Sequence, residues 1–326
     1  MQNFELRFNR VKIITMHKTD KSIVYSLTHS TYTHVLLSLF LLSPVLLSGT
    51  AKAAEIILQF THTERSMQPG EVVLFEVRSS SPLKQMNISA FGRKFPAFTK
   101  DDGLNWNCLV GIDRDCKPGR YDIKVQGNGM DGSSVSKPYS LDVLSKEFPT
   151  RVLEVEPKYV TPPANILNRI RNERKLVDDI FASTTQEKFW KGPFQLPVPG
   201  KVISEFGKRS IFNGEPRSAH SGTDFRGAVG TPIYAPNAGR VVLTRDLYYS
   251  GNTVIIDHGL GLYSYLGHMS AINVKERDYV EIGALVGKVG ATGRVTGPHL
   301  HWTVRLCISR VDPISLINIF ENSRTN

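Results

Sequence analysis

Cysteine is scarce in this 326-residue chain, which contains only Cys108, Cys116 and Cys307. No two of them form a Cys-x-x-Cys pair, so a cysteine-based zinc site has no support in the sequence. Cys108 and Cys116 bracket a short polar loop and could form a disulfide in an oxidising compartment. Cys307 is then expected to be a lone thiol near the C-terminus.

Clusters of basic residues interleaved with aromatic ones are also lacking, which argues against nucleic acid as a partner. The chain has 40 Lys and Arg against 30 Asp and Glu, a formal net charge of +10. Residues 1–53 hold six basic and two acidic residues, so about six excess positive charges remain for the rest. Such a charge favours an anionic polymer or surface without selecting one.

Long hydrophobic runs are lacking except near the N-terminus, where a basic, polar lead precedes the apolar run Val35–Leu47. An Ala-Lys-Ala sequence ending at Ala53 follows, so residues 1–53 are expected to be a secretory signal peptide cleaved after Ala53, with Met16 as an alternative start. The run is short for a membrane span and contains Pro44, so an uncleaved anchor is less favoured and no stable membrane insertion is expected after cleavage. No cysteine follows the run, which argues against a lipid anchor. We expect an exported protein of the periplasm or cell envelope, or a secreted one.

The remainder is predicted to be mainly β. Short strands separated by Gly, Pro, Asn and Asp clusters favour an immunoglobulin-like β-sandwich over residues 54–145, with a binding or spacing role. Residues 146–196 are expected to be a linker with one α-helix near residues 164–182, after Pro162-Pro163. That helix either docks on a domain or covers and orients a catalytic groove. From residue 197 to 318, dense short strands and glycine turns predict an antiparallel β domain with little helix.

Five of the nine histidines lie in this last domain: His220, His258, His268, His299 and His301. Strict alternation from His299 places both histidines of His299-Leu-His301 on one strand face, although a polar edge strand would show the same pattern. His220 and Asp224 are four residues apart, so an extended segment would also put them on one face. Catalytic zinc needs three protein ligands and one open position, which His220, Asp224 and one histidine of the pair would supply. The helical His-Glu-x-x-His motif is absent, and His258 is expected to cap a hairpin turn rather than to bind metal.

Several further motifs occur in a fixed order around these histidines: Phe206-Gly-Lys-Arg209, Asn213-Gly-Glu-Pro-Arg217, Thr231-Pro-Ile-Tyr-Ala235, Gly251-Asn-Thr-Val-Ile-Ile-Asp-His-Gly259, Tyr265-Leu-Gly-His-Met-Ser270 and Thr296-Gly-Pro-His-Leu-His301. Together with His220-x-x-x-Asp224 they resemble the lysostaphin-like, LytM-type zinc endopeptidases of peptidase family M23 over roughly residues 200–310. Arg277 departs from the pattern, because the family usually has glycine there, and this puts one turn geometry in doubt.

The resemblance implies a LytM/lysostaphin-type (duplicated hybrid motif) catalytic domain holding one Zn²⁺ per chain. Carried over residue by residue, it makes His220, Asp224 and His301 the zinc ligands. His268 and His299 become the catalytic pair beside the metal. Asn213 and Tyr265 are expected to contact substrate, with a packing role as the alternative for Tyr265.

The resemblance also implies a peptidoglycan hydrolase, that is, a zinc metalloendopeptidase that cuts peptide cross-links of the bacterial cell wall. One alternative is a non-catalytic wall-binding or amidase-activating protein on the same fold. Another keeps the zinc chemistry but acts on glycine-rich or extracellular protein targets. The presence of all five expected site residues favours an enzyme over the non-catalytic alternative.

Overall fold

The computed structural model describes residues 5–6, 14–19, 22–26, 55–99 and 101–322, and the chain divides into two compact units, residues 1–53 and 54–326. In the first unit the described residues form a three-stranded antiparallel sheet of β1 (Glu5–Leu6), β2 (Ile14–Thr19) and β3 (Ser22–Ser26). The apolar run Val35–Leu47 and the expected cleavage site lie outside the described residues, so the signal peptide stays a prediction. In the part of the chain that the structure describes, every helix is too short or too polar to span a bilayer.

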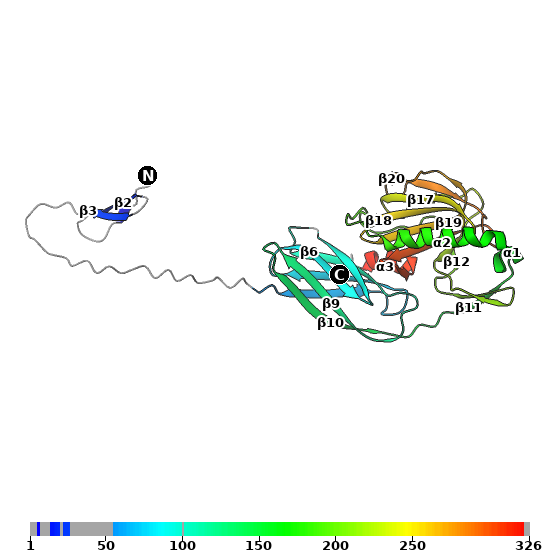
Figure 1. Cartoon of the computed structure of the whole chain (residues 1–326), viewed down its shortest axis with the longest axis horizontal. Helices are drawn as coiled ribbons and strands as arrows, with labels where there is room; N and C mark the ends of the chain where they lie inside the picture. Colours follow the sequence, from blue (N-terminus) through cyan, green and yellow to red (C-terminus); the bar gives the residue numbers. More distant parts are fainter. Residues whose placement is uncertain (1–4, 7–13, 20–21, 27–54, 100, 323–326) are drawn as a thin grey trace, which may run out of the picture. The chain divides into compact units, whose positions relative to one another are not determined.

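The second unit begins with an immunoglobulin-like β-sandwich (Figure 1). Its strands are β4 (Leu58–Glu64), β5 (Val72–Ser79), β6 (Leu83–Ala90), β7 (Arg93–Thr99), β8 (Asn105–Gly111), β9 (Gly119–Gly129) and β10 (Ser134–Val143). Strands β4, β5 and β8 pair on one side and β6, β9 and β10 on the other, while β7 pairs with β6 through its first half and with β8 through its second. The two ends of this path meet where His62 Nε2 lies 2.9 Å from the Tyr139 hydroxyl. The strands therefore enclose one apolar core, so the expected sandwich is present in a closed, barrel-like form.

The C-terminal part is an antiparallel sheet, as expected from its glycine-rich pattern. In spatial order its main path runs through β12 (Val202–Ser204), β15 (Thr223–Arg226), β22 (His299–Leu306), β19 (Leu262–Ile272), β18 (Gly251–Gly259), β17 (Gly239–Leu247) and β20 (Tyr279–Val280). Three short strands join it from the side: β16 (Pro232–Tyr234), β21 (Leu285–Val289) and β23 (Ser309–Val311). The chain then enters a helix that the sequence analysis did not anticipate, α3 (Pro313–Asn322).

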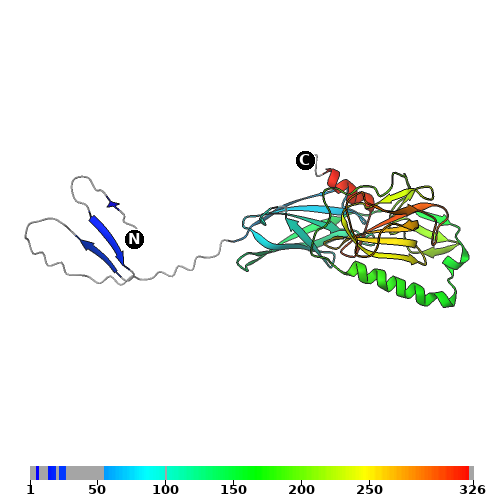
Figure 2. The same ribbon diagram turned by 90° about the horizontal axis from the view of Figure 1, so that it is seen from above.

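The connector between these two parts contains a strand as well as the expected helix. Strand β11 (Thr150–Leu153) pairs in parallel with β13 (Arg209–Phe212), which pairs with β14 (Glu215–Arg217). The helical elements are α1 (Pro157–Val160), the 3₁₀ turn η1 (Ala164–Ile166) and α2 (Leu167–Ala182). Helix α2 runs alongside the C-terminal strands (Figure 2) and buries Phe181 against Leu243, Ile255 and Tyr263. The helix is therefore held by apolar packing on the sheet.

The sandwich is fixed to the C-terminal part rather than tethered to it. Asp113 accepts hydrogen bonds from the Arg310 backbone N–H at 2.9 Å and from its Nη2 at 2.6 Å. At Gly70, where φ is +89°, an added Cβ would lie 2.5 Å from the Phe206 ring. Glycine is therefore needed there both for the left-handed backbone and for the close approach of the two parts.

All three cysteines are free thiols in the structure. Cys108 lies inside β8, fully buried, and its Sγ donates to the Phe95 carbonyl oxygen at 3.3 Å, whereas Cys116 is half-buried beyond the end of the strand. The possible Cys108–Cys116 disulfide is therefore not formed, because Cys108 faces the sandwich core and not the polar loop.

Candidate metal centre

Three neighbouring strands bring the predicted site residues together. Asp224 on β15 lies opposite His301 on β22, and His301 lies opposite Gly267 on β19, next to His268. Directly paired residues of adjacent antiparallel strands project from the same face of the sheet. The pairing β15–β22–β19 therefore gathers side chains that are far apart in sequence.

His220 reaches the site by a different route from the one expected. It precedes β15, so His220 and Asp224 do not share a face of one strand. Between them the backbone passes so close to β22 that a Cβ on Gly222 would lie 2.3 Å from the Trp302 carbonyl oxygen. This close passage returns His220 to the site, with its Nε2 atom 2.8 Å from Asp224 Oδ1.

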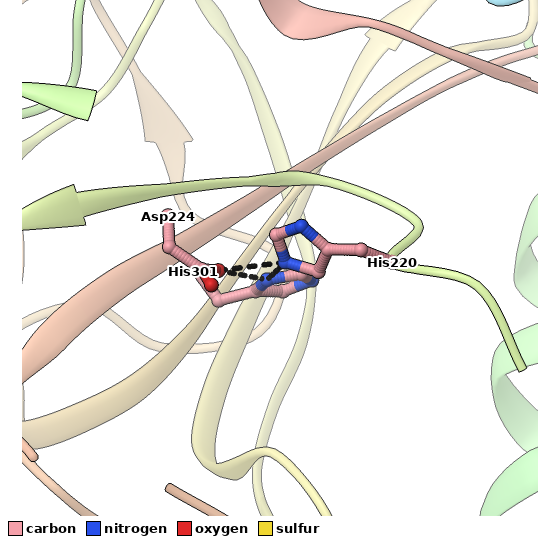
Figure 3. A group of neighbouring side chains, drawn as sticks. All are labelled: His220, Asp224 and His301. Atoms are coloured by element: carbon pink, nitrogen blue, oxygen red, sulfur yellow. Dashed lines mark hydrogen bonds and ion pairs between the residues drawn. The ribbon is translucent and has the colours of Figure 1, made fainter. Parts of the chain in front are cut away.

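The three expected ligands converge on one point (Figure 3). His301 Nδ1 lies 2.8 Å from Asp224 Oδ1 and 3.1 Å from His220 Nε2. Ligand atoms held at about 2.0–2.2 Å from a tetrahedral zinc ion lie about 3.3 Å apart, so these donors need to move by only a few tenths of an ångström. Two imidazole nitrogens and one carboxylate oxygen suit zinc, and the set leaves a coordination position for water.

Hydrogen bonds outside the ligand set fix which ring nitrogens face the centre. His220 Nδ1 lies 3.0 Å from the carbonyl oxygen of Glu205, which can only accept, so Nδ1 carries the proton and Nε2 is left as the donor to a metal. On His301 the assignment is reversed, because Nε2 lies 2.9 Å from Thr303 Oγ1 and Nδ1 faces the centre. Both rings are thus oriented for coordination.

Asp224 is held as a carboxylate. Burial acts to raise its pKa, but the adjacent His220 and His301 side chains outweigh burial and keep that pKa well below its usual range. Its second oxygen, Oδ2, lies 3.4 Å from Arg151 Nη1. Arg151 belongs to connector strand β11 and is itself held by Ser204 Oγ at 2.6 Å and Ser210 Oγ at 3.1 Å.

The two remaining histidines lie beside the ligands. The His268 and His299 ring centroids are 4.8 Å apart, and His299 Nε2 lies 3.8 Å from Asp224 Oδ1. Each ring donates from Nδ1 to a backbone carbonyl at 2.8 Å, His268 to Thr292 and His299 to Gly297. In the neutral form both therefore present an unprotonated Nε2. Burial, together with the neighbouring histidines, lowers the pKa of His268 to about 3.

His268 has a strained backbone. Its φ is +66°, which is uncommon for a residue other than glycine, and its N–H donates to the Ser250 carbonyl at 2.7 Å. The register of β18 against β19 also shifts beside it. Irregularities of this kind re-aim side chains and concentrate at functional sites.

A groove of about 300 Å³ contains all five residues. Part of its wall comes from the connector: Arg151 and Leu153 from β11, and Val177 and Phe181 from α2. Helix α2 is therefore docked on the sheet and also lines the groove, while a role in covering or orienting the groove stays a prediction.

Of the two predicted substrate contacts, Tyr265 lies in the groove and Asn213 lies outside its lining. Tyr265 lines the groove, and its hydroxyl donates to Ser250 Oγ. Asn213 does not line it; its side chain accepts from the Val155 N–H at 2.9 Å and donates to the Val155 carbonyl at 2.8 Å. Its role in binding substrate stays a prediction, and the contact that the structure shows is with the connector.

His258 is fully buried in β18, with Nδ1 2.8 Å from the Ala238 carbonyl and Nε2 2.9 Å from Ser264 Oγ. It is a core residue rather than a turn cap.

Arg151 is a site residue that the sequence did not reveal. It reaches Asp224 because β11 pairs with β13, and the paired residues Thr150 and Arg209 are 59 positions apart in the chain. No local motif marks it.

The comparisons with known proteins agree with this geometry. The model of Peptidase family M23 matches residues 218–313. The crystal structure of a Pseudomonas aeruginosa protein assigned to peptidase M23 is 32% identical, with a TM-score of 0.60 over 78% of this chain and 96% of that one. The chain therefore belongs to peptidase family M23.

Two relatives from Vibrio cholerae carry more specific names. Peptidoglycan DD-endopeptidase ShyA is 44% identical over 111 residues, covering 33% of this chain and 26% of ShyA. Peptidoglycan DD-endopeptidase ShyB is 31% identical over 189 residues, covering 57% of this chain and 40% of ShyB. The chain thus spans less than half the length of either relative.

Proposed function

We propose that this protein is a zinc-dependent endopeptidase that hydrolyses peptide cross-links of bacterial peptidoglycan. The observation that carries the proposal is the convergence of His220, Asp224 and His301, whose possible ligand atoms all lie within 4.8 Å of one another, beside two further imidazoles in an open groove. Family membership and the names of ShyA and ShyB support the substrate class. In this proposal residues 197–318 form the catalytic domain, residues 146–196 the linker and residues 54–145 an accessory domain.

We further propose export to the periplasm or cell envelope, with residues 1–53 removed. The order of basic lead, apolar run and Ala-Lys-Ala supports this. The substrate class supports it too, because cross-linked wall peptides lie outside the cytoplasmic membrane.

The chemistry divides between the metal and the two free imidazoles. Zinc, when bound, supplies a water of lowered pKa and polarises the scissile carbonyl. His220 and His301 bind through nitrogens whose partners on the far side of each ring prevent rotation. Asp224 provides the negative ligand.

His268 and His299 handle the protons. Their Nδ1–H groups are engaged by backbone carbonyls, so each neutral ring offers Nε2 as an acceptor. One ring accepts the proton of the attacking water and, once charged, donates it to the leaving amine. The other then stabilises developing negative charge when it is protonated, or accepts a second hydrogen bond when it is neutral.

The test uses the full chain and purified peptidoglycan sacculi, with soluble products measured by mass and bound zinc by elemental analysis. The His299→Ala variant is expected to retain one zinc per chain and to lose cleavage by about 10²–10⁴-fold, while His220→Ala loses zinc and activity together. His62→Gln, which changes a histidine in the sandwich, serves as the matched control. Cleavage by His299→Ala at the control rate would refute the assignment, and a glycine-rich peptide digested in parallel tests the alternative substrate.

A further inference from the structure

One face of β22 forms a floor that leads away from the metal centre. Side chains on that face follow in the order His299, His301, Thr303 and Arg305, and all four line the groove. Because a strand rises about 3.4 Å per residue, Arg305 is displaced by about 14 Å along the strand from ligand His301. That distance corresponds to a few residues of an extended peptide bound beside the strand.

The Arg305 guanidinium has few polar partners. Its Nη1 donates to the Ile308 carbonyl at 3.3 Å, its carbon Cζ lies 5.1 Å from the Phe181 ring centroid, and its buried Nε has no hydrogen-bond partner. Within the described residues no carboxylate forms an ion pair with it. Burial, with the charge of Arg310, lowers its pKa to about 10 against the opposing charges of Asp113 and Asp178.

The groove as a whole carries excess positive charge. Its lining includes three arginines, Arg151, Arg294 and Arg305, against one acid, Asp224. A metal ion bound at Asp224 would add to this imbalance. A neutral peptide gains nothing from such a field, whereas an acidic one is attracted into the groove and held there.

We propose that Arg305 recognises a free carboxylate of the substrate, so that the groove selects acidic peptides over neutral, glycine-rich ones. This rests on the proposed function and names the residue that would give it specificity. A guanidinium is the side chain best suited to bind a carboxylate, because its planar N–H donors match the carboxylate oxygens. Phe181 of α2 covers the other side of the guanidinium, so the connector helix forms part of the subsite.

The competing explanation is structural: Arg305 could serve only to hold α2 through its stacking on Phe181. The two explanations differ in their substrate dependence. Loss of a structural contact lowers cleavage of every peptide alike, whereas loss of a carboxylate-binding group removes only the advantage of peptides that carry the carboxylate.

The experiment uses the full, zinc-loaded chain and two synthetic cross-linked peptides with the same scissile bond, one with free carboxylates and one with these amidated. Wild type is expected to prefer the acidic peptide by about tenfold or more in kcat/KM, chiefly through KM. Arg305→Met is expected to reduce that ratio to near one, Arg305→Lys to retain part of it, and Arg245→Met, at an exposed arginine of β17, to keep the wild-type ratio.

An unchanged ratio in Arg305→Met, or equal loss on both peptides, would overturn the proposal. Equal cleavage of both peptides by wild type would overturn it as well while leaving the endopeptidase function intact. Cleavage of neither peptide, together with intact sacculi, would instead count against the proposed function. Should Arg305→Met fail to fold, the ratio for Arg305→Lys and its dependence on salt decide the question.

Discussion

Replacement of Arg151 by methionine tests whether the connector takes part in holding the metal. Asp224 turns Oδ1 toward both ligand imidazoles and Oδ2 toward Arg151 Nη1, 3.4 Å away. Arg151 is in turn positioned by two serine hydroxyls. Methionine keeps much of the side-chain volume and removes the donor that orients the carboxylate. Loss of such a partner costs about 10–100-fold in metal affinity, or about 1.4–2.8 kcal/mol.

Whether zinc affinity rises or falls in Arg151→Met shows whether Arg151 acts by orienting Asp224 or only through its charge. Removing a positive charge near a cation site should tighten metal binding if long-range electrostatics dominate. Loss of an orienting hydrogen bond should weaken it. Zinc affinity of the full chain is measured by competition with a chromophoric chelator at fixed pH and salt. Arg209→Met, which removes an exposed charge next to Ser210 on β13, is the matched control. Unchanged or tighter binding in Arg151→Met would refute the orienting role.

Two further changes test the packing around the site. Phe181→Ala removes a side chain that is 5% exposed and packs on Tyr263, so urea denaturation should show a loss of about 3–5 kcal/mol; a loss below 1 kcal/mol would mean that α2 is not firmly docked. Burial acts to raise the pKa of Asp113, but bonds from Arg310 outweigh it and lower that pKa, so the folded state binds fewer protons. Asp113→Asn should therefore cost about 2 kcal/mol at pH 7, and its difference from wild type should shrink as the pH falls below about 4. A difference that stays constant between pH 7 and 3.5 would contradict this.

The sequence was sufficient wherever function depends on local pattern. The two-residue alternation after His299 predicted the strand and the face that carries both histidines, and the expected sheet and sandwich are present. It placed His220 at the site but not by the right route, since an even spacing cannot reveal that Gly222 passes against the Trp302 carbonyl. The left-handed backbone of His268 likewise depends on its pairing with Ser250, not on its neighbours in sequence.

Long-range pairing explains the other omissions. Arg151 reaches Asp224 only because β11 pairs in parallel with β13, and parallel pairing leaves no turn signal in the sequence. The position of Cys108 was misjudged for a related reason: Cys108 falls within β8, a strand set by its pairing with β5 and β7 rather than by an obvious alternating pattern.

The region that builds the metal centre is larger than the region that matches the family model, residues 218–313. Ligand His220 donates to the Glu205 carbonyl, and its own backbone carbonyl accepts from the Gly207 N–H at 2.9 Å. The Gly207 carbonyl accepts from Arg114 Nη2 of the sandwich at 3.0 Å. A chain of hydrogen bonds thus joins the sandwich to one ligand, while Arg151 joins the connector to another. Because coordination geometry depends on the groups behind the ligands, the sandwich and the connector are expected to influence metal affinity even though neither supplies a ligand.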